Sequence, residues 1–151
     1  MTEPGEPDRP RPTLPGAVPR PSALRHAWLW GPVVLQMAVI FWASSIPRLG
    51  RLPGGVTDWV GHAIGYGLLG ALLLRALAGG RLSGVNGRRA LAAVLLATLY
   101  GVSDEAHQWF VPGRSPDRLD VLADCLGAAL AVTAGVAAAR ARRWGILKSF
   151  R

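Results

Sequence analysis

The amino-acid sequence predicts an all-α membrane protein: four transmembrane helices in a compact bundle, with both termini in the cytoplasm. Two observations carry this prediction. Half of the 151 residues are hydrophobic although the formal net charge is +8, and the charged residues lie in short clusters between long apolar blocks. An α-helix needs about 20 apolar residues to cross a bilayer. Lys and Arg gather in the connections that stay in the cytoplasm.

The apolar blocks place the four helices at residues 27–46, 59–77, 90–111 and 121–139. Pro47 and Pro112 end the first and third helices, because a proline disfavours helical backbone in the residue before it. The uncharged part of the third block is short, so that helix can span only if it includes Asp104 and Glu105. Residues 115–120 offer side chains that can cap the fourth helix.

Composition divides the chain into three parts. The first 22 residues contain seven prolines and few apolar residues, so segment 1–26 is expected to be disordered. This segment is not expected to be a signal peptide, because the apolar stretch after it is too long and no small-residue cleavage site stands out. Residues 27–139 form the predicted transmembrane domain, and residues 140–151 form a basic cytoplasmic tail.

The distribution of Lys and Arg orients the predicted helices. The N-terminal segment, the second connection and the C-terminal tail together hold 13 of these residues, and the two remaining connections hold 4. The positive-inside rule therefore places both termini in the cytoplasm of a multi-pass protein of the cell membrane. The basic clusters then serve as topology signals and as contacts for membrane lipids, so no nucleic-acid partner is expected.

Polar residues recur at helical spacing near the predicted outer ends of three helices. They are Asp58, His62 and Tyr66 on the second helix, Tyr100, Asp104, Glu105 and Gln108 on the third, and Asp117, Asp120 and Asp124 on the fourth. Residues three or four apart share one face of a helix. Gly61, Gly65, Gly127, Ala131 and Gly135 permit close helix approach, so we expect the acids of three helices to share one cavity.

Charged groups inside a membrane domain are costly and commonly functional. Candidate acid–base residues are Asp58, His62, Asp104 and Glu105; candidate ligand-binding residues are Tyr66, Gln108, Arg114, Asp120 and Asp124. For the acids, the alternative is a polar network that locks the helices together. For His62 it is a hydrogen bond to a carbonyl group of another helix, and for Arg114 it is an ion pair with Asp117 or Asp120. His107 is expected to be interfacial.

Metal and cofactor binding are not specified by the pattern. Asp58, His62, Asp104, Glu105 and Asp124 are ligand types for metals, but the sequence has neither an HExxH motif nor paired cysteines. The sequence therefore predicts no metal site and leaves the cofactor unknown. The fork of Arg114 matches the geometry of phosphate oxygens.

Three segments resemble those of the VanZ-like family of small integral membrane proteins. They are DWVGHAIGY at 58–66, SDEAHQWFVPGRSPDRLD at 103–120 and DVLADCLGAALA at 120–131. The second segment is the most specific, because its Asp-Glu pair, Gln, Phe, Pro-x-Arg and following Asp occur in the family's order. The resemblance covers about residues 28 to 139. Trp59 stands where the family has Lys and Asp124 where it has Asn, so this cavity is more acidic than the family pattern.

The resemblance implies a role in the cell envelope, since the family is named for a protein that gives low-level resistance to teicoplanin. The first hypothesis is a protein that binds or modulates a lipid-linked or glycopeptide-like ligand at the outer leaflet. The second is an enzyme acting on a lipid-linked envelope precursor, with Glu105 or Asp104 as general base, His62 as its partner and Arg114 holding phosphate. The third is a structural partner subunit. A homo-oligomer is compatible with all three.

Overall fold

The computed structural model describes residues 22–47 and 58–149 of the chain. In these residues every regular element is helical and none is a strand, which confirms the predicted all-α class. The elements are α1 Ala23–Ser44, α2 Asp58–Leu77, the 3-10 helix η1 Leu82–Gly84, α3 Gly87–Gln108 and α4 Arg118–Ser149. The segment predicted to be disordered lies, up to Pro21, outside the described residues.

Capping side chains fix where two helices begin. Ser22 Oγ accepts a hydrogen bond from the backbone N–H of Arg25 at 3.3 Å, and Asn86 Oδ1 accepts one from that of Arg89 at 3.0 Å. Both helices therefore start earlier than the predicted residues 27 and 90, because the polar cap and not the first apolar residue sets the boundary. At its other end α3 stops at Gln108, before the predicted residue 111.

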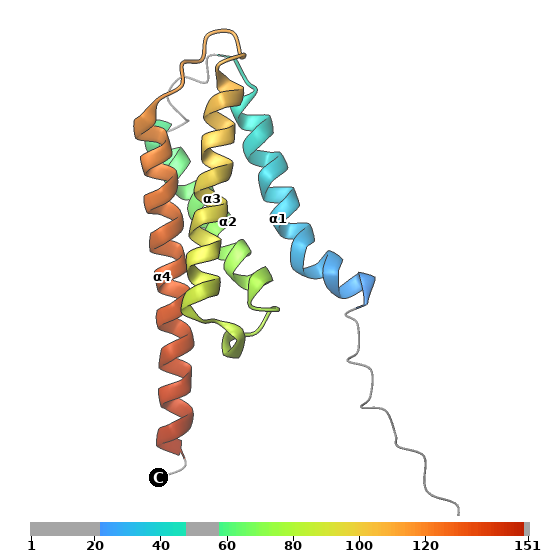
Figure 1. Ribbon diagram of the computed structural model, residues 1–151, viewed down its shortest axis with the longest axis vertical. Coiled ribbons are helices and arrows are strands. Elements are labelled where there is room, and N and C mark those ends of the chain that lie inside the picture. The colour runs from blue at the N-terminus through green and yellow to red at the C-terminus, as the bar shows by residue number, and fades with distance from the viewer. Residues whose placement is uncertain (1–21, 48–57, 150–151) are drawn as a thin grey trace, which may run out of the picture.

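Helix α4 is longer than the predicted 121–139. It starts at Arg118 and continues to Ser149, so most of the predicted basic tail is helical. Residues 140–149 hold three arginines, one alanine, one leucine and one lysine, which favour helix, and contain no proline. Arg143 Nη2 donates to the carbonyl oxygens of Ser83 at 2.9 Å and Val85 at 3.2 Å, which ties α4 to η1. Figure 1 shows α4 projecting beyond the other helices.

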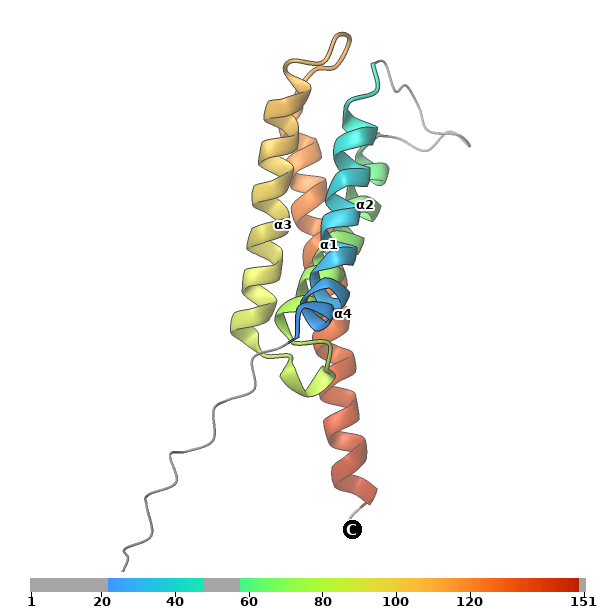
Figure 2. The same cartoon turned by 90° about the vertical axis from the view of Figure 1, so that its right-hand side faces the viewer.

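The four α-helices form an up-and-down bundle (Figures 1 and 2). Helices α1 and α3 run in one direction, and α2 and α4 run in the other. One end of the bundle, here called the polar end, holds the end of α1, the start of α2, the end of α3 and the start of α4. The opposite end, called the basic end, holds η1, the start of α1 and the end of α4.

Glycine lets α2 and α4 pack closely along the centre of the bundle. A Cβ atom on Gly127 would collide with the carbonyl group of Ala63, and one on Gly70 would lie 3.0 Å from the Cα of Ala128. The sequence identified Gly127 but not Gly70 as a packing position. Gly65, expected in the same role, faces α1, where an added Cβ would lie 4.0 Å from Ile40 Cγ1, an ordinary contact distance.

Polarity is inverted relative to a water-soluble bundle. Asp104, Glu105 and Asp124 are buried, whereas large apolar side chains cover the outside. Among the described residues, three helical segments are long and apolar enough to cross a membrane: Ala23–Ser44, Asp58–Leu77 and Arg118–Gly145. Helix α3 is not among them because it carries arginines near its start and acids near its end.

Arg75 of α2 bonds to the backbone of α1 near the basic end, at a carbonyl oxygen that a proline leaves without its donor. Pro32 lies inside α1 and has no N–H, so the carbonyl oxygen of Trp28 loses its usual helical donor. Arg75 Nη1 donates to that oxygen at 3.2 Å, and its guanidinium lies 3.7 Å from the centroid of the Trp28 ring. Arg75 thus completes the backbone hydrogen bonding of the neighbouring helix.

Candidate functional site

A cavity of about 210 Å³ lies at the polar end of the bundle. Helices α1 and α2 supply most of its walls, α3 contributes Asp104, and the connection between α3 and α4 contributes Arg114. The remaining lining residues are Gln36, Val39, Ile40, Ala43, Ser44, Asp58, Gly61, His62, Gly65 and Tyr66. The cavity therefore has an apolar wall on α1 and a polar wall on α2.

A tight turn places Arg114 over this cavity. The backbone N–H of Arg114 donates to the carbonyl of Val111 at 3.1 Å, and Gly113 between them has a φ of 81°. Proline followed by a residue with positive φ is the pattern of a type II turn. Arg114 Nη1 donates to Asp58 Oδ2 at 3.4 Å, and its Nε donates to the Ser44 carbonyl at 3.5 Å. The turn thus brings Arg114 to the end of α1 and the start of α2.

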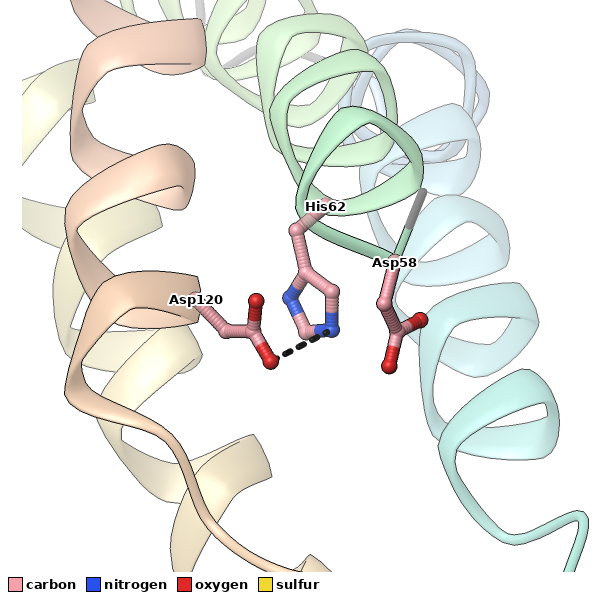
Figure 3. A group of neighbouring side chains, drawn as sticks. All are labelled: Asp58, His62 and Asp120. Carbon is pink, nitrogen blue, oxygen red and sulfur yellow. Dashed lines mark ion pairs between the residues drawn. The ribbon is translucent and has the colours of Figure 1, made fainter. Parts of the chain in front are cut away.

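His62 lies between α2 and α4, with acids on two sides. Its Nδ1 is 3.0 Å from Asp124 Oδ1, and its Nε2 is 3.9 Å from Asp120 Oδ2. Figure 3 shows the imidazole between Asp120 and Asp58. An ionised carboxylate only accepts hydrogen bonds, so Nδ1 is the donor to Asp124. In the neutral ring, Nε2 then carries the free lone pair.

Asp124 fits at this position because the neighbouring residue of α3, Gly101, has no side chain. A Cβ atom on Gly101 would collide with the Asp124 carboxylate, whose residue is fully buried. Gly101 continues a buried row of small residues on α3 with Ala93 and Ala97, spaced by four. Small residues at this spacing indicate a close helix contact, which was not among the predictions from the sequence.

Glu105 and Gln108 form a network behind the cavity. Gln108 Nε2 donates to Asp104 Oδ2 at 3.2 Å and to Glu105 Oε1 at 3.3 Å. Glu105 Oε2 accepts the backbone N–H of Asp117 at 2.7 Å. Glu105 therefore fixes the connection between α3 and α4 and does not line the cavity.

Two buried polar atoms on the cavity wall have no hydrogen-bond partner among the described residues. They are Asp104 Oδ1 and Tyr66 Oη, on residues that are 4% and 1% exposed. Asp124 Oδ2, next to His62, also has no hydrogen-bond partner among the described residues. Buried polar groups are almost always hydrogen-bonded, so these atoms leave hydrogen-bonding capacity unused at and beside the cavity wall.

The nine predicted site residues separate into two sets. Asp58, His62, Tyr66, Asp104 and Arg114 line the cavity, whereas Glu105, Gln108, Asp120 and Asp124 support it from behind or beside. His107, expected to be interfacial, accepts or donates a 3.0 Å hydrogen bond with Ser45 and stacks on Phe41. Gln36 also lines the cavity, although no motif or spacing distinguishes this residue. Its Nε2 donates to the Gly65 carbonyl at 3.1 Å.

Arg114 supplies the guanidinium of this site, yet its contacts are long. A guanidinium has five N–H donors, and the bonds to Asp58 and Ser44 occupy two of them among the described residues. The side chain is only 9% exposed. The structure thus contains the ion pair of Arg114, but with Asp58 and not with the expected Asp117 or Asp120. Donors remain for an anionic group in the cavity.

Comparison with known proteins identifies the class. A family model described as VanZ/LLP1 matches residues 33–138, which is more than half of the chain. The chain therefore belongs to the VanZ/LLP1 family, and its helices make it a membrane protein of that family. No curated protein and no solved structure matches it. The resemblance that the sequence segments indicate is thereby confirmed.

Proposed function

We propose that this protein crosses the cell membrane four times, with both termini in the cytoplasm and the polar end at the outer leaflet. The inverted polarity of the bundle supports burial in lipid, because apolar side chains face outward along its length. Helix α3 would span as the fourth helix, with Asp104 and Glu105 turned into the bundle. The arginine-rich basic end would then face the cytoplasm, as the positive-inside rule requires.

In this position the cavity binds the head group of a lipid-linked, phosphate-bearing envelope ligand. The observation that carries this proposal is the guanidinium of Arg114, nine-tenths buried on the cavity wall with donors to spare. Arginine pairs with phosphate through two parallel hydrogen bonds. The apolar wall of Val39, Ile40 and Ala43 would lie beside the first carbons of the lipid chain.

The size of the cavity favours a head group over an entire glycopeptide. Sites that enclose a drug-sized ligand have volumes of about 300–1,000 Å³, and this cavity has about 210 Å³. A protein that holds lipid-linked precursors at the outer leaflet would alter how many of them a glycopeptide antibiotic can reach. A contribution to teicoplanin resistance is the expected consequence in a cell that makes such precursors.

The test compares Arg114→Gln with Arg118→Gln, which removes an exposed arginine at the start of α4. Each full-length protein is incubated in mild detergent with a polyprenyl phosphate and measured by native mass spectrometry. We expect Arg114→Gln to weaken lipid retention by about tenfold or more, because a charged hydrogen bond contributes roughly 1.5–3 kcal/mol. Arg118→Gln should retain the lipid like the unmodified protein. Equal retention by both variants would refute the role of Arg114.

A second candidate function is catalysis on the same class of lipid. The observation that favours it is the pair of His62 and Asp124 beside the cavity, since a carboxylate that orients an imidazole is a common general-base arrangement. Of the two acids predicted as general base, Asp104 lines the cavity and Glu105 does not. Turnover would appear as a new lipid species during the incubation, abolished in His62→Gln although the lipid is still retained.

A further inference from the structure

The cavity region holds more carboxyl groups than basic groups that could pair with them. Five carboxylates surround it, from Asp58, Asp104, Glu105, Asp120 and Asp124, and the facing basic groups are Arg114 and His62. Buried charges of one sign repel one another, and they require a proton or a further cation. A phosphate group would add to this excess, so Arg114 by itself does not balance the charge of the proposed ligand.

The carboxylates are arranged around one imidazole. Ligand atoms of Asp58, His62 and Asp120 lie within 4.8 Å of one another, and so do those of His62, Asp104 and Glu105. Figure 3 shows the first group, with Asp58 and Asp120 on either side of the His62 ring. Because both groups contain His62, the four acids converge on this one residue from α2, α3 and α4.

The separation of His62 Nε2 from Asp120 Oδ2 suits two ligands of a common ion. At 3.9 Å the two atoms are too far apart for a hydrogen bond. Two atoms that each lie about 2.0–2.2 Å from a shared zinc ion can be separated by at most about 4.4 Å. The pair therefore needs little movement to coordinate one ion between them.

Asp124 prepares the imidazole for this role. Its carboxylate accepts the Nδ1 proton of His62 at 3.0 Å, which fixes the tautomer whose Nε2 lone pair faces Asp120. A carboxylate that holds the second nitrogen of a histidine ligand is the usual outer contact of protein metal sites. Sequence spacing could not reveal this arrangement, because His62 and Asp124 are 62 residues apart.

An independent observation also points to a ligand. Asp104 Oδ1 lies on the cavity wall, on a residue that is 4% exposed, and has no partner among the described residues. Asp104 belongs to the second group around His62. A cation bound in the cavity beside His62, or a water on that cation, would give this oxygen a partner.

We propose that this protein holds a divalent cation at His62 Nε2, ligated by Asp58 and Asp120, with Asp104 of α3 lining the same cavity. One imidazole and several carboxylates suit Zn²⁺ or Mn²⁺. The ion offsets the acids and bridges them to the phosphate of the ligand. This bridging step rests on the proposed function, whereas binding of the ion does not.

The experiment measures metal binding to the full chain without lipid. Protein purified in mild detergent is stripped with a chelator, titrated with Zn²⁺ or Mn²⁺ in a calorimeter and then analysed for metal content. We expect one ion per chain, with affinity at least about tenfold lower in Asp58→Asn, in His62→Gln and in the outer-contact variant Asp124→Asn. The matched control is Asp117→Asn, which alters an exposed acid at the same end and should bind like the unmodified protein.

Asp58 is half exposed, so its variant should fold even if changes at buried residues do not. A stripped protein that takes up no ion, or an Asp58→Asn variant that binds as tightly as Asp117→Asn, would overturn the cation site. Polyprenyl phosphate is then added to the stripped and reloaded proteins. Lipid retention without any metal uptake would support the proposed function and refute the cation site. Metal uptake without lipid retention would support the cation site and refute the proposed function.

Discussion

Glu105 uses both oxygens of its carboxylate to hold the polar end together. One oxygen accepts the Asp117 N–H and the other accepts the Gln108 side chain, and the residue is buried. Glu105→Gln has a single acceptor oxygen, so one of the two donors is left without a partner. We expect the free energy of unfolding to fall by about 1–3 kcal/mol, measured by thermal or denaturant unfolding in detergent.

The control for this change is Asp117→Asn. Its backbone N–H still reaches Glu105, and its exposed side chain keeps an oxygen for the Leu119 N–H. Its stability should therefore stay within about 0.5 kcal/mol of the unmodified protein. If Glu105→Gln proves equally stable, the network does not hold the connection between α3 and α4.

At the scale of single residues, helical spacing predicted which polar side chains share a face. Asp58, His62 and Asp104 were identified in this way, and they meet at the cavity. Spacing could not show which oxygens are already used by other protein groups. Glu105, predicted as a candidate base, is engaged by a backbone N–H twelve residues away. Such a contact depends on the turn at Gly113, whose path no periodicity encodes.

At the scale of helices, the contact between α2 and α4 depends on Gly127. A Cβ atom there would meet the Ala63 carbonyl carbon at 2.8 Å, which is backbone and cannot rotate away. The two helices would have to separate in Gly127→Ala. We expect a loss of about 1–3 kcal/mol in unfolding free energy, together with weaker ligand retention, because His62 and Asp124 lie on these two helices.

Gly145→Ala provides the matched comparison near the end of α4. Apart from its chain neighbours and its own helix backbone, no atom lies within 4 Å of the added Cβ, and the position is inside a helix. Alanine is favoured over glycine there by roughly 0.5–1 kcal/mol, so this variant should be as stable as the unmodified protein or more so. Similar losses in both variants would show that glycine at 127 is not required for close packing.

Helix boundaries were predicted less well than helix existence. The long apolar blocks located all four helices, but α3 is displaced toward the N-terminus because Asn86 caps it. Helix α4 exceeds its apolar block because the following Ala and Arg residues also favour helix, and Arg143 anchors them. Apolar content reports where a helix meets lipid or core, whereas caps and propensity decide where it starts and stops.

At the scale of the whole molecule, the proposed orientation can be measured with single cysteines. Cys125 is replaced by alanine, and cysteine is introduced at Ser115 near the polar end or at Ser83 in η1, both exposed. A membrane-impermeant maleimide should label Ser115→Cys in intact cells, because the proposed orientation places the polar end outside. Ser83→Cys should be labelled only after the cells are opened.

The reverse labelling pattern would place the cavity on the cytoplasmic side, and labelling of both sites in intact cells would contradict four spans. The proposed orientation rests on the arginine distribution in the sequence, which acts on membrane insertion and not on packing. Packing shows something that composition does not: the acids of α3 point into the bundle. Together they explain how a helix with charged ends can serve as the fourth span.

The length of α4 has a consequence for the surroundings of the cavity. From Asp120 to Arg143 the helix is about 35 Å long at 1.5 Å per residue, a little more than the roughly 30 Å hydrocarbon layer of a bilayer. Arg143 is tied to η1, so the helix cannot slide to relieve a mismatch without moving the bundle. A thicker membrane would draw His62 and its acids toward hydrocarbon, and a thinner one would lift them into water. Bilayer thickness is thus expected to tune how readily ions and head groups reach the cavity.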